Sequence, residues 1–161
     1  KFLLSDGVSI DTRKLNKGDL FFALSGPNFN GNRFVQEAID KGASCAVIDD
    51  TDFVIEGKTV LVPNSLEALQ KLAIFHRDRI RKPVFAITGS NGKTTTKELV
   101  AQVLAKKYKV HATKGNLNNH IGVPLTLLQI HPQIEIAIIE MGASHVGDMA
   151  VRYFLTKEIA I

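Results

Sequence analysis

Residues 84–95 read VFAITGSNGKTT, and this stretch decides the fold of the second half of the chain. Residues 84–88 form an uninterrupted apolar pattern, which is typical of a strand inside a parallel sheet that is covered on both faces. Beyond the glycines, apolar residues recur at helical spacing and predict a helix over residues 93–107. We therefore predict a strand, a glycine-rich loop and a helix in direct succession.

The loop has the chemistry of an anion site. Glycines allow a tight turn in which backbone N–H groups point into one concavity, and a helix N-terminus adds partial positive charge. Lys93 would bring a mobile charge to the outer phosphates of ATP, and the Thr94 hydroxyl could hold Mg²⁺. The residues that we expect to bind ATP are Gly89, Ser90, Asn91, Gly92, Lys93, Thr94 and Thr95. Only two residues separate the glycines, where the common phosphate loop has four, so a structural turn stays the alternative.

Strands and helices alternate after this loop. The pattern predicts strands at residues 108–112 and 134–140, helices at 124–130 and 147–155, and the start of a strand at 159–161. Glu140 ends the strand at 134–140, and open α/β sheets bind ligands at the carboxyl ends of their strands. We expect Glu140 to be a second magnesium ligand, with a solvated strand-end carboxylate as the alternative.

The first half of the chain predicts a smaller α/β unit. Strand patterns occur at residues 19–24, 45–48 and 60–62, and a helix pattern at 32–41. Asn64 with Glu67 three residues later indicates a capping box at the start of a second helix, which Pro83 ends. We predict a domain boundary near residues 81–84, and hence domains 1–82 and 83–161. The chain looks like a fragment cut at both ends.

Composition narrows the function classes. Hydrophobic residues make up 45% of the 161 residues and charged residues 22%, as in ordinary globular domains. The net charge of +4 is spread along the chain and tryptophan is absent, so we expect no nucleic-acid partner. No stretch is long and apolar enough to cross a bilayer. Cys45 is the single cysteine, and we expect it to be a core residue in a protein of the reducing cytoplasm.

Four motifs, made up of six segments, resemble the Mur ligases, which build the peptide of bacterial peptidoglycan. Residues 88–95 resemble the ATP site of that family, and residues 9–13, 18–24 and 26–31 are similar to its UDP-binding N-terminal domain. Residues 115–126 look like the segment typical of the member that adds D-alanyl-D-alanine, and residues 140–143 like the strand end that supplies a magnesium-binding glutamate. The segments follow the order of the family and span nearly the whole chain.

The resemblance implies an ATP- and Mg²⁺-dependent amide ligase. Its substrates would be UDP-N-acetylmuramoyl-tripeptide and D-Ala-D-Ala, joined through an acyl phosphate. Lys93 and Glu140 would be catalytic, and Thr94 and Glu140 would hold the metal. The substrate contacts implied are Thr12, Pro27, Asn28, Phe29, Asn118 and Asn119. The fold implied is a small α/β UDP-binding domain followed by the first part of a P-loop-type parallel-sheet ATP-binding domain.

Other readings stay open. The residues around Thr12, and the Asn118–Asn119 pair, could be simple turns. The member that adds the third peptide residue should carry threonines in place of this asparagine pair. Folate-polyglutamating ligases should read Gly-Lys-Gly, and Thr94 after Lys93 argues against them. A non-catalytic nucleotide-binding module is the rival from another class. We expect a monomer.

Overall fold

The computed structural model describes residue 2 and residues 5–142, and the chain divides into two compact units between Leu69 and Gln70. The division lies inside helix α2 (Ser65–Ile80). The predicted boundary near residues 81–84 stays a prediction, although the strands on its two sides do belong to separate sheets. No helix in the described part of the chain is long and apolar enough to cross a membrane.

The first unit is built on a four-stranded parallel sheet in the order β1-β2-β5-β6. Its strands are β1 (Val8–Ser9), β2 (Leu20–Phe22), β5 (Cys45–Ile48) and β6 (Thr59–Leu61). Between β2 and β5 lie a 3-10 helix (Gly31–Phe34) and α1 (Val35–Asp40), and a second 3-10 helix (Thr51–Phe53) precedes β6. Phe21 and Ile48 of the sheet share one core with Val35 and Ala38 of α1.

A short antiparallel hairpin follows β2 in the first unit. Strands β3 (Ser25–Gly26) and β4 (Phe29–Asn30) pair with each other, so residues 27 and 28 form the turn. Gly31 comes directly after β4, and a Cβ atom there would lie only 2.2 Å from the backbone oxygen of Leu24. Glycine is therefore needed at Gly31 for the hairpin to return against the end of β2.

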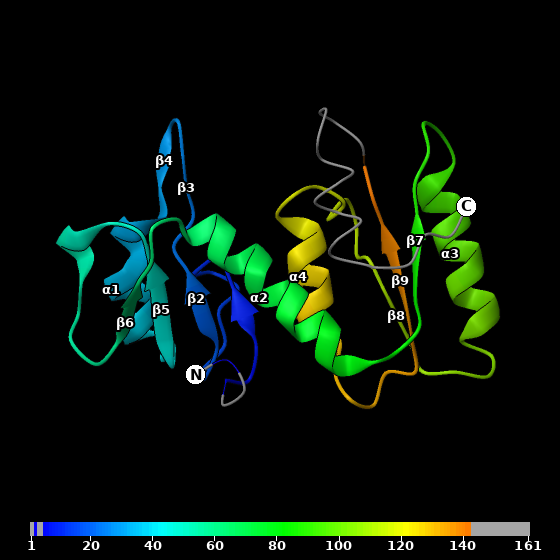
Figure 1. Cartoon of the computed structure of the whole chain (residues 1–161), viewed down its shortest axis with the longest axis horizontal. Helices are drawn as coiled ribbons and strands as arrows, with labels where there is room; N and C mark the ends of the chain where they lie inside the picture. The colour runs from blue at the N-terminus through cyan, green and yellow to red at the C-terminus, as the bar shows by residue number, and fades with distance from the viewer. Residues whose placement is uncertain (1, 3–4, 143–161) are drawn as a thin grey trace. The chain divides into compact units, whose positions relative to one another are not determined.

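The second unit holds a three-stranded parallel sheet in the order β7-β9-β8 (Figure 1). The strands are β7 (Val84–Ile87), β8 (Val110–Ala112) and β9 (Ile136–Glu140), and the helices are α3 (Lys93–Leu104) and α4 (Gly122–Leu128). The connection from β7 to β8 passes across β9, and the connection from β8 to β9 runs back. Because parallel crossovers are right-handed, the two helices lie on opposite faces of the sheet, as Figure 1 shows.

Helix α3 buries a narrower face than its apolar residues suggest. Lys97 is fully buried, whereas Leu99 and Val103 are 59% and 71% exposed. These two side chains and the 41%-exposed Phe85 of β7 line an apolar groove of about 410 Å³. The expectation that residues 84–88 are covered on both faces is therefore wrong for Phe85 in the described part of the chain, where β7 is an edge strand.

Most predicted elements are present with shifted ends. The predicted strands correspond to β2, β5, β6, β7, β8 and β9, and the predicted helices to α1, α2, α3 and α4. Asn64 accepts a hydrogen bond from the Glu67 N–H, as the capping box predicts, and Cys45 is buried in the core. The two-residue strands β1, β3 and β4 were not predicted. The helix and strand predicted at residues 147–155 and 159–161 lie outside the described residues.

Candidate active site

The glycine-rich loop joins β7 to α3 and depends on its two glycines. Gly89 has φ +137° and Gly92 has φ +77°, and both values lie where side chains with a Cβ are strained. Gly92 is the N-cap of α3, and its carbonyl accepts the first helical hydrogen bond from the Thr96 N–H. The loop therefore delivers the chain into α3 with the N-terminal amides of the helix at an exposed turn.

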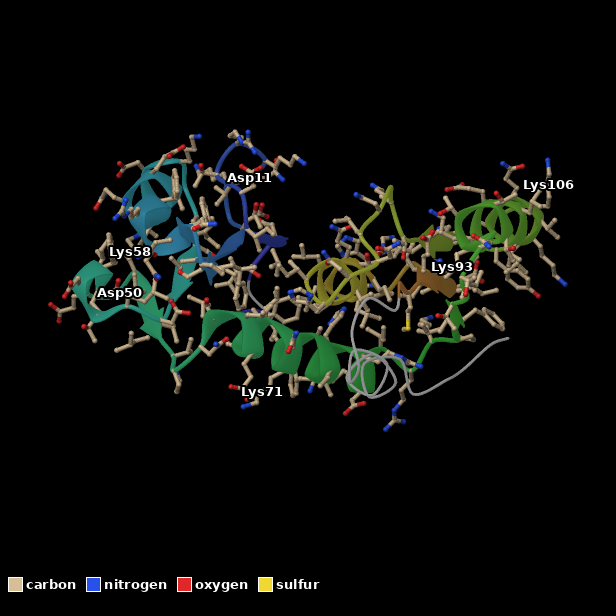
Figure 2. All side chains as sticks on the ribbon, turned by 90° about the horizontal axis from the view of Figure 1, so that it is seen from above. Asp11, Asp50, Lys58, Lys71, Lys93 and Lys106 are labelled. Atoms are coloured by element: carbon tan, nitrogen blue, oxygen red, sulfur yellow. The ribbon has the colours of Figure 1, made fainter. Side chains whose placement is uncertain are left out.

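Lys93 lies at the loop end of α3, while Lys106 marks the other end (Figure 2). The Lys93 ammonium group donates to the backbone oxygen of Gly89 and, over 3.3 Å, to that of Ser90. Both carbonyl groups belong to the exposed loop. The charge thus lies over the loop on a side chain that can exchange these carbonyls for the oxygens of an anion.

Glu140 comes from the neighbouring strand and reaches the same loop. It pairs in register with Ile87, the last residue of β7, which places it at the carboxyl end of the sheet beside the loop. Glu140 Oε1 accepts hydrogen bonds from Thr94 Oγ1 over 3.1 Å and from Asn118 Nδ2 over 2.9 Å. The side chain is 2% exposed, so the alternative of a solvated carboxylate is wrong.

Lys97 is the residue of this site that the sequence analysis missed. Its ammonium group lies 3.6 Å from Glu140 Oε2 and donates to the backbone oxygen of Thr113 over 2.8 Å. Thr113 also holds Glu140, because its hydroxyl accepts from the Glu140 N–H over 2.9 Å. The available signal was position: Lys97 precedes Ala101 and Leu104 by four and seven residues, so it stands on their face of α3.

The residues present fit a magnesium ion. The Glu140 carboxylate keeps unused acceptor capacity: Oε1 lies beside Thr94, and the buried Oε2 has no hydrogen-bond partner, since its 3.6 Å separation from Lys97 is too long for a hydrogen bond. The Thr94 hydroxyl donates its proton to Glu140 and keeps its lone pairs for another group. Magnesium prefers such oxygen ligands completed by phosphates and water. The described residues contain no cluster of three or more His, Cys, Asp or Glu side chains that would form a cage made of protein groups alone.

Asn118 and Asn119 have different surroundings. Asn118 donates its amide to Glu140, and its backbone oxygen accepts from the Gly142 N–H over 2.8 Å. Asn119 Oδ1 accepts from the N–H groups of Ile121 and Gly122, over 3.1 and 2.8 Å, and so satisfies backbone donors at the start of α4. The structure thus brings Asn118 to the candidate metal site, whereas Asn119 shapes the entrance to α4.

The first unit has a cavity of its own, of about 650 Å³. Thr12 and Phe29 line it, and the Phe29 ring stacks on that of Phe34 with centroids 5.6 Å apart. Pro27 and Asn28 form the exposed hairpin turn and are not among the lining residues. The remaining lining residues are Ile10, Asp11, Arg13, Phe21, Gly31 and Glu37.

The charges at this cavity are fixed near neutral pH. Hydrogen bonds from Arg13 lower the pKa of the Asp11 carboxyl to about 2. The hydrogen bond from Lys41 lowers the pKa of Glu37, and the two groups lie 2.7 Å apart. The aromatic pair offers an apolar face to a base, and the carboxylates can accept hydrogen bonds from sugar hydroxyl groups, while Arg13 offsets the charge of Asp11.

Comparison with known families agrees with this arrangement. A model described as the catalytic domain of the Mur ligase family matches residues 5–111, more than half of the chain, and a model of the Mur ligase middle domain matches residues 87–161. The chain belongs to the Mur ligase family.

Curated relatives and solved structures show which members of the family the chain is similar to. This Mur ligase chain is 43% identical over 145 residues to the UDP-N-acetylmuramoyl-tripeptide–D-alanyl-D-alanine ligase of Bacillus subtilis, and 44% identical over 155 residues to that of Synechocystis. These matches cover 89% and 94% of the chain but 32% and 34% of the relatives. The chain therefore spans about a third of the length of the curated relatives it matches.

The structural matches point the same way. The MurF ligase of Thermotoga maritima, solved in complex with ADP, matches with a TM-score of 0.83 and 34% identity, over 96% of this chain and 36% of that one. A ligase from Acinetobacter baumannii, named for joining D-alanyl-D-alanine to a diaminopimelate-containing precursor, matches with a TM-score of 0.85 and 32% identity, over 94% and 34% of the two chains.

Proposed function

We propose that the protein carrying this chain is an ATP-dependent ligase that joins D-Ala-D-Ala to UDP-N-acetylmuramoyl-tripeptide. The observation that carries the proposal is the hydrogen bond between Thr94 of the phosphate loop and Glu140 of β9. This contact puts a hydroxyl group and a carboxylate, both suited to a metal ion, beside a loop whose N–H groups and lysine suit phosphates. The proposed reaction is taken from the relatives named above, because two of them bear the name of this ligase.

In the proposed reaction the substrate carboxylate attacks the terminal phosphorus of ATP. The new acyl–phosphate bond forms as the bond to ADP breaks, and the amine of D-Ala-D-Ala then displaces phosphate from the acyl carbon. Such chemistry needs positioning and charge neutralisation more than a strong acid or base. The N–H groups of the loop Gly89–Thr95 and the Lys93 ammonium group would hold the phosphates, including the charge that moves to the leaving ADP.

Thr94 and Glu140 are the residues that would hold Mg²⁺. The metal would neutralise phosphate charge and orient the transferred group. Glu140 would offer the ion its Oε1, the oxygen beside Thr94, and Asn118, which donates to this oxygen, would have to yield or share it. We keep Asn118 as a proposed substrate contact, because its amide donates to the Glu140 oxygen beside the loop. Asn119 is a weaker candidate, because its carbonyl oxygen already accepts two backbone N–H groups.

The cavity of the first unit would take the UDP part of the substrate. Thr12 and Phe29 are the proposed contacts, together with Pro27 and Asn28 of the adjoining hairpin turn. The stacked rings of Phe29 and Phe34 offer an apolar face to a base, and the Asp11 and Glu37 carboxylates can accept from sugar hydroxyls. Because ATP supplies the energy, we place the reaction in the cytoplasm, and we expect the protein to act as a monomer.

The experiment is an assay of amide formation with the protein expressed from its complete reading frame. ATP, Mg²⁺, D-Ala-D-Ala and UDP-N-acetylmuramoyl-tripeptides ending in diaminopimelate or lysine are supplied, and mass spectrometry detects the product. We expect product that requires all components and is missing with Lys93→Ala. Product from a UDP-dipeptide and a single amino acid would instead identify a third-residue-adding ligase. Nucleotide binding without product from either set would favour a non-catalytic module.

A further inference from the structure

Lys97 is unusual because it is a lysine that lies buried in the middle of helix α3. Among the described lysines it is the one that is fully buried, while every other lysine is at least partly exposed. Burial of an ammonium group is costly unless it is paired and hydrogen-bonded. A buried lysine on α3 therefore calls for a reason beyond packing.

Its ammonium group has three neighbours with different roles. It donates to the backbone oxygen of Thr113 over 2.8 Å and lies 3.0 Å from the carboxylate of Glu98, a side chain that is 57% exposed. The third neighbour is Glu140 Oε2, at 3.6 Å, whose side chain is as buried as that of Lys97. Water screens the attraction between Lys97 and the exposed Glu98, so the buried Glu140 interacts more strongly with the lysine charge.

The two oxygens of Glu140 face different groups. Oε2 lies 3.6 Å from the Lys97 ammonium group inside the unit, while Oε1 accepts from Thr94 and Asn118 at the loop. The lysine thereby fixes which oxygen is turned inward and which one meets the Thr94 hydroxyl. It also supplies a counter-charge that lets the carboxylate stay buried before any cation arrives.

We propose that Lys97 is a positioning residue of the nucleotide site, which holds the Glu140 carboxylate inward through Oε2 so that Oε1 is presented to Thr94. Lys97 acts through Glu140 and need not touch nucleotide or substrate. The inference rests on the proposed role of Glu140 in the metal site. Its first test requires neither nucleotide nor metal, so it can fail independently of the proposed ligase function.

The first test is a double-mutant cycle on the nucleotide-free protein from the complete reading frame. Lys97→Met keeps the length of the side chain and removes its charge, and Glu140→Gln keeps the shape of the carboxylate and removes its charge. We expect Lys97→Met to lower the melting temperature by about 5 °C or more, because it leaves Glu140 buried and unpaired. In the Glu140→Gln background the same change should cost less than half as much. Equal costs in both backgrounds would overturn the proposal.

A matched control separates the two acidic neighbours. Glu98→Gln removes the exposed partner of Lys97 and leaves the buried one, so we expect it to change the melting temperature little. A drop in melting temperature as large as that of Lys97→Met would show that Lys97 acts mainly through Glu98, which would contradict the proposal.

The second test measures how nucleotide binding depends on magnesium. If Lys97 positions Glu140, Lys97→Met should raise the Mg²⁺ concentration needed for half-maximal ADP binding severalfold. A cation that merely competes with Mg²⁺ would have the opposite effect when it is removed, and a purely structural lysine would have none. A lowered or unchanged magnesium requirement in the folded Lys97→Met protein would therefore refute the assignment.

Discussion

Thr94 Oγ1 lies 3.1 Å from Glu140 Oε1, although 46 residues separate the two along the chain. The contact exists because β7 and β9 are neighbours in register, with Ile87 opposite Glu140, so the loop after β7 begins where β9 ends. A parallel sheet brings such loop and strand-end residues together at its carboxyl edge.

Lys93→Ala should abolish turnover of the protein from the complete reading frame and leave its stability nearly unchanged. The Lys93 ammonium group contacts only exposed loop carbonyls in the described structure, so its loss removes little packing. Activity and melting temperature are measured together, with Lys106→Ala beyond the far end of α3 as the matched control. Retained turnover in Lys93→Ala would show that the loop is not the triphosphate site.

Glu140→Gln should lower both stability and magnesium-dependent catalysis. The carboxylate is buried beside Lys97, and breaking a buried ion pair from one side costs on the order of 3 kcal/mol. ADP binding without magnesium should weaken much less than the magnesium-dependent increase in binding. Magnesium titrations of ADP binding and of turnover decide this. An unaltered metal requirement would exclude Glu140 as a ligand.

Substitutions of Asn118 and of Asn119 should have different effects. Asn119→Asp keeps the oxygen that accepts from the start of α4, whereas Asn119→Ala loses it and should cost about 1 kcal/mol of stability. Asn118→Ala removes the amide from Glu140 and should alter the magnesium requirement. The free energy of unfolding and the KM values for each substrate are compared across the three variants. A large KM change in a stable Asn119→Asp protein would restore Asn119 as a substrate contact.

Phe29→Ala should weaken binding of UDP-containing substrate with little effect on stability. Phe29 is 55% exposed and offers its ring to the cavity and to Phe34. Calorimetric titration with the UDP-linked precursor measures the affinity. Phe75→Ala serves as control, because Phe75 is 49% exposed and lies on α2 outside the cavity lining. Equal affinity losses in the two variants would argue against the cavity as the UDP site.

Stability of the second unit should fall as the pH drops below 6.5. Burial on β8 lowers the pKa of His111 from its ordinary 6.5; its hydrogen bond to the Thr126 carbonyl opposes this shift, and the nearby charges of Lys114 and His131 reinforce it. The unfolded chain therefore binds the proton first, and stability that is complete above pH 6.5 is lost as the pH falls toward the folded pKa.

His111→Gln should flatten part of this pH dependence. The pKa of His76 is lowered in the same direction by burial, so the variant should keep a remainder of the slope. Unfolding free energies on both sides of pH 6.5 provide the measurement. A variant with the full wild-type slope would show that His111 does not carry the effect.

Much of the fold was predictable because local signals agree with it. The buried strands are apolar runs, and the α2 cap is formed by the side chain that its spacing predicts. The two-residue strands gave no signal, because their pairing depends on neighbours distant in sequence. Phe85 and Val103 show that an apolar residue need not be buried in its own unit.

The site was predictable where a motif carries the chemistry. The loop and Glu140 follow from glycine spacing and from the end of a strand, respectively. Lys97 was missed because a lysine in a helix is expected to reach solvent. Its burial depends on Thr113 and Glu140, which approach α3 only in the folded unit. The different partners of Asn118 and Asn119 could not be predicted either. Both residues carry amides in one turn, and only the folded unit brings Glu140 to one of them.

The joint role of the phosphate loop, Thr94 and Glu140 can be observed in a crystal structure of the protein from the complete reading frame with ADP and Mn²⁺ in place of Mg²⁺. We expect the ADP phosphates on the amides of Gly89–Thr95. We also expect an anomalous manganese peak within about 2.3 Å of Thr94 Oγ1, with the Glu140 carboxylate as a ligand or one water molecule away. Phosphates or manganese bound elsewhere, with Thr94 and Glu140 still joined as they are here, would contradict this joint role.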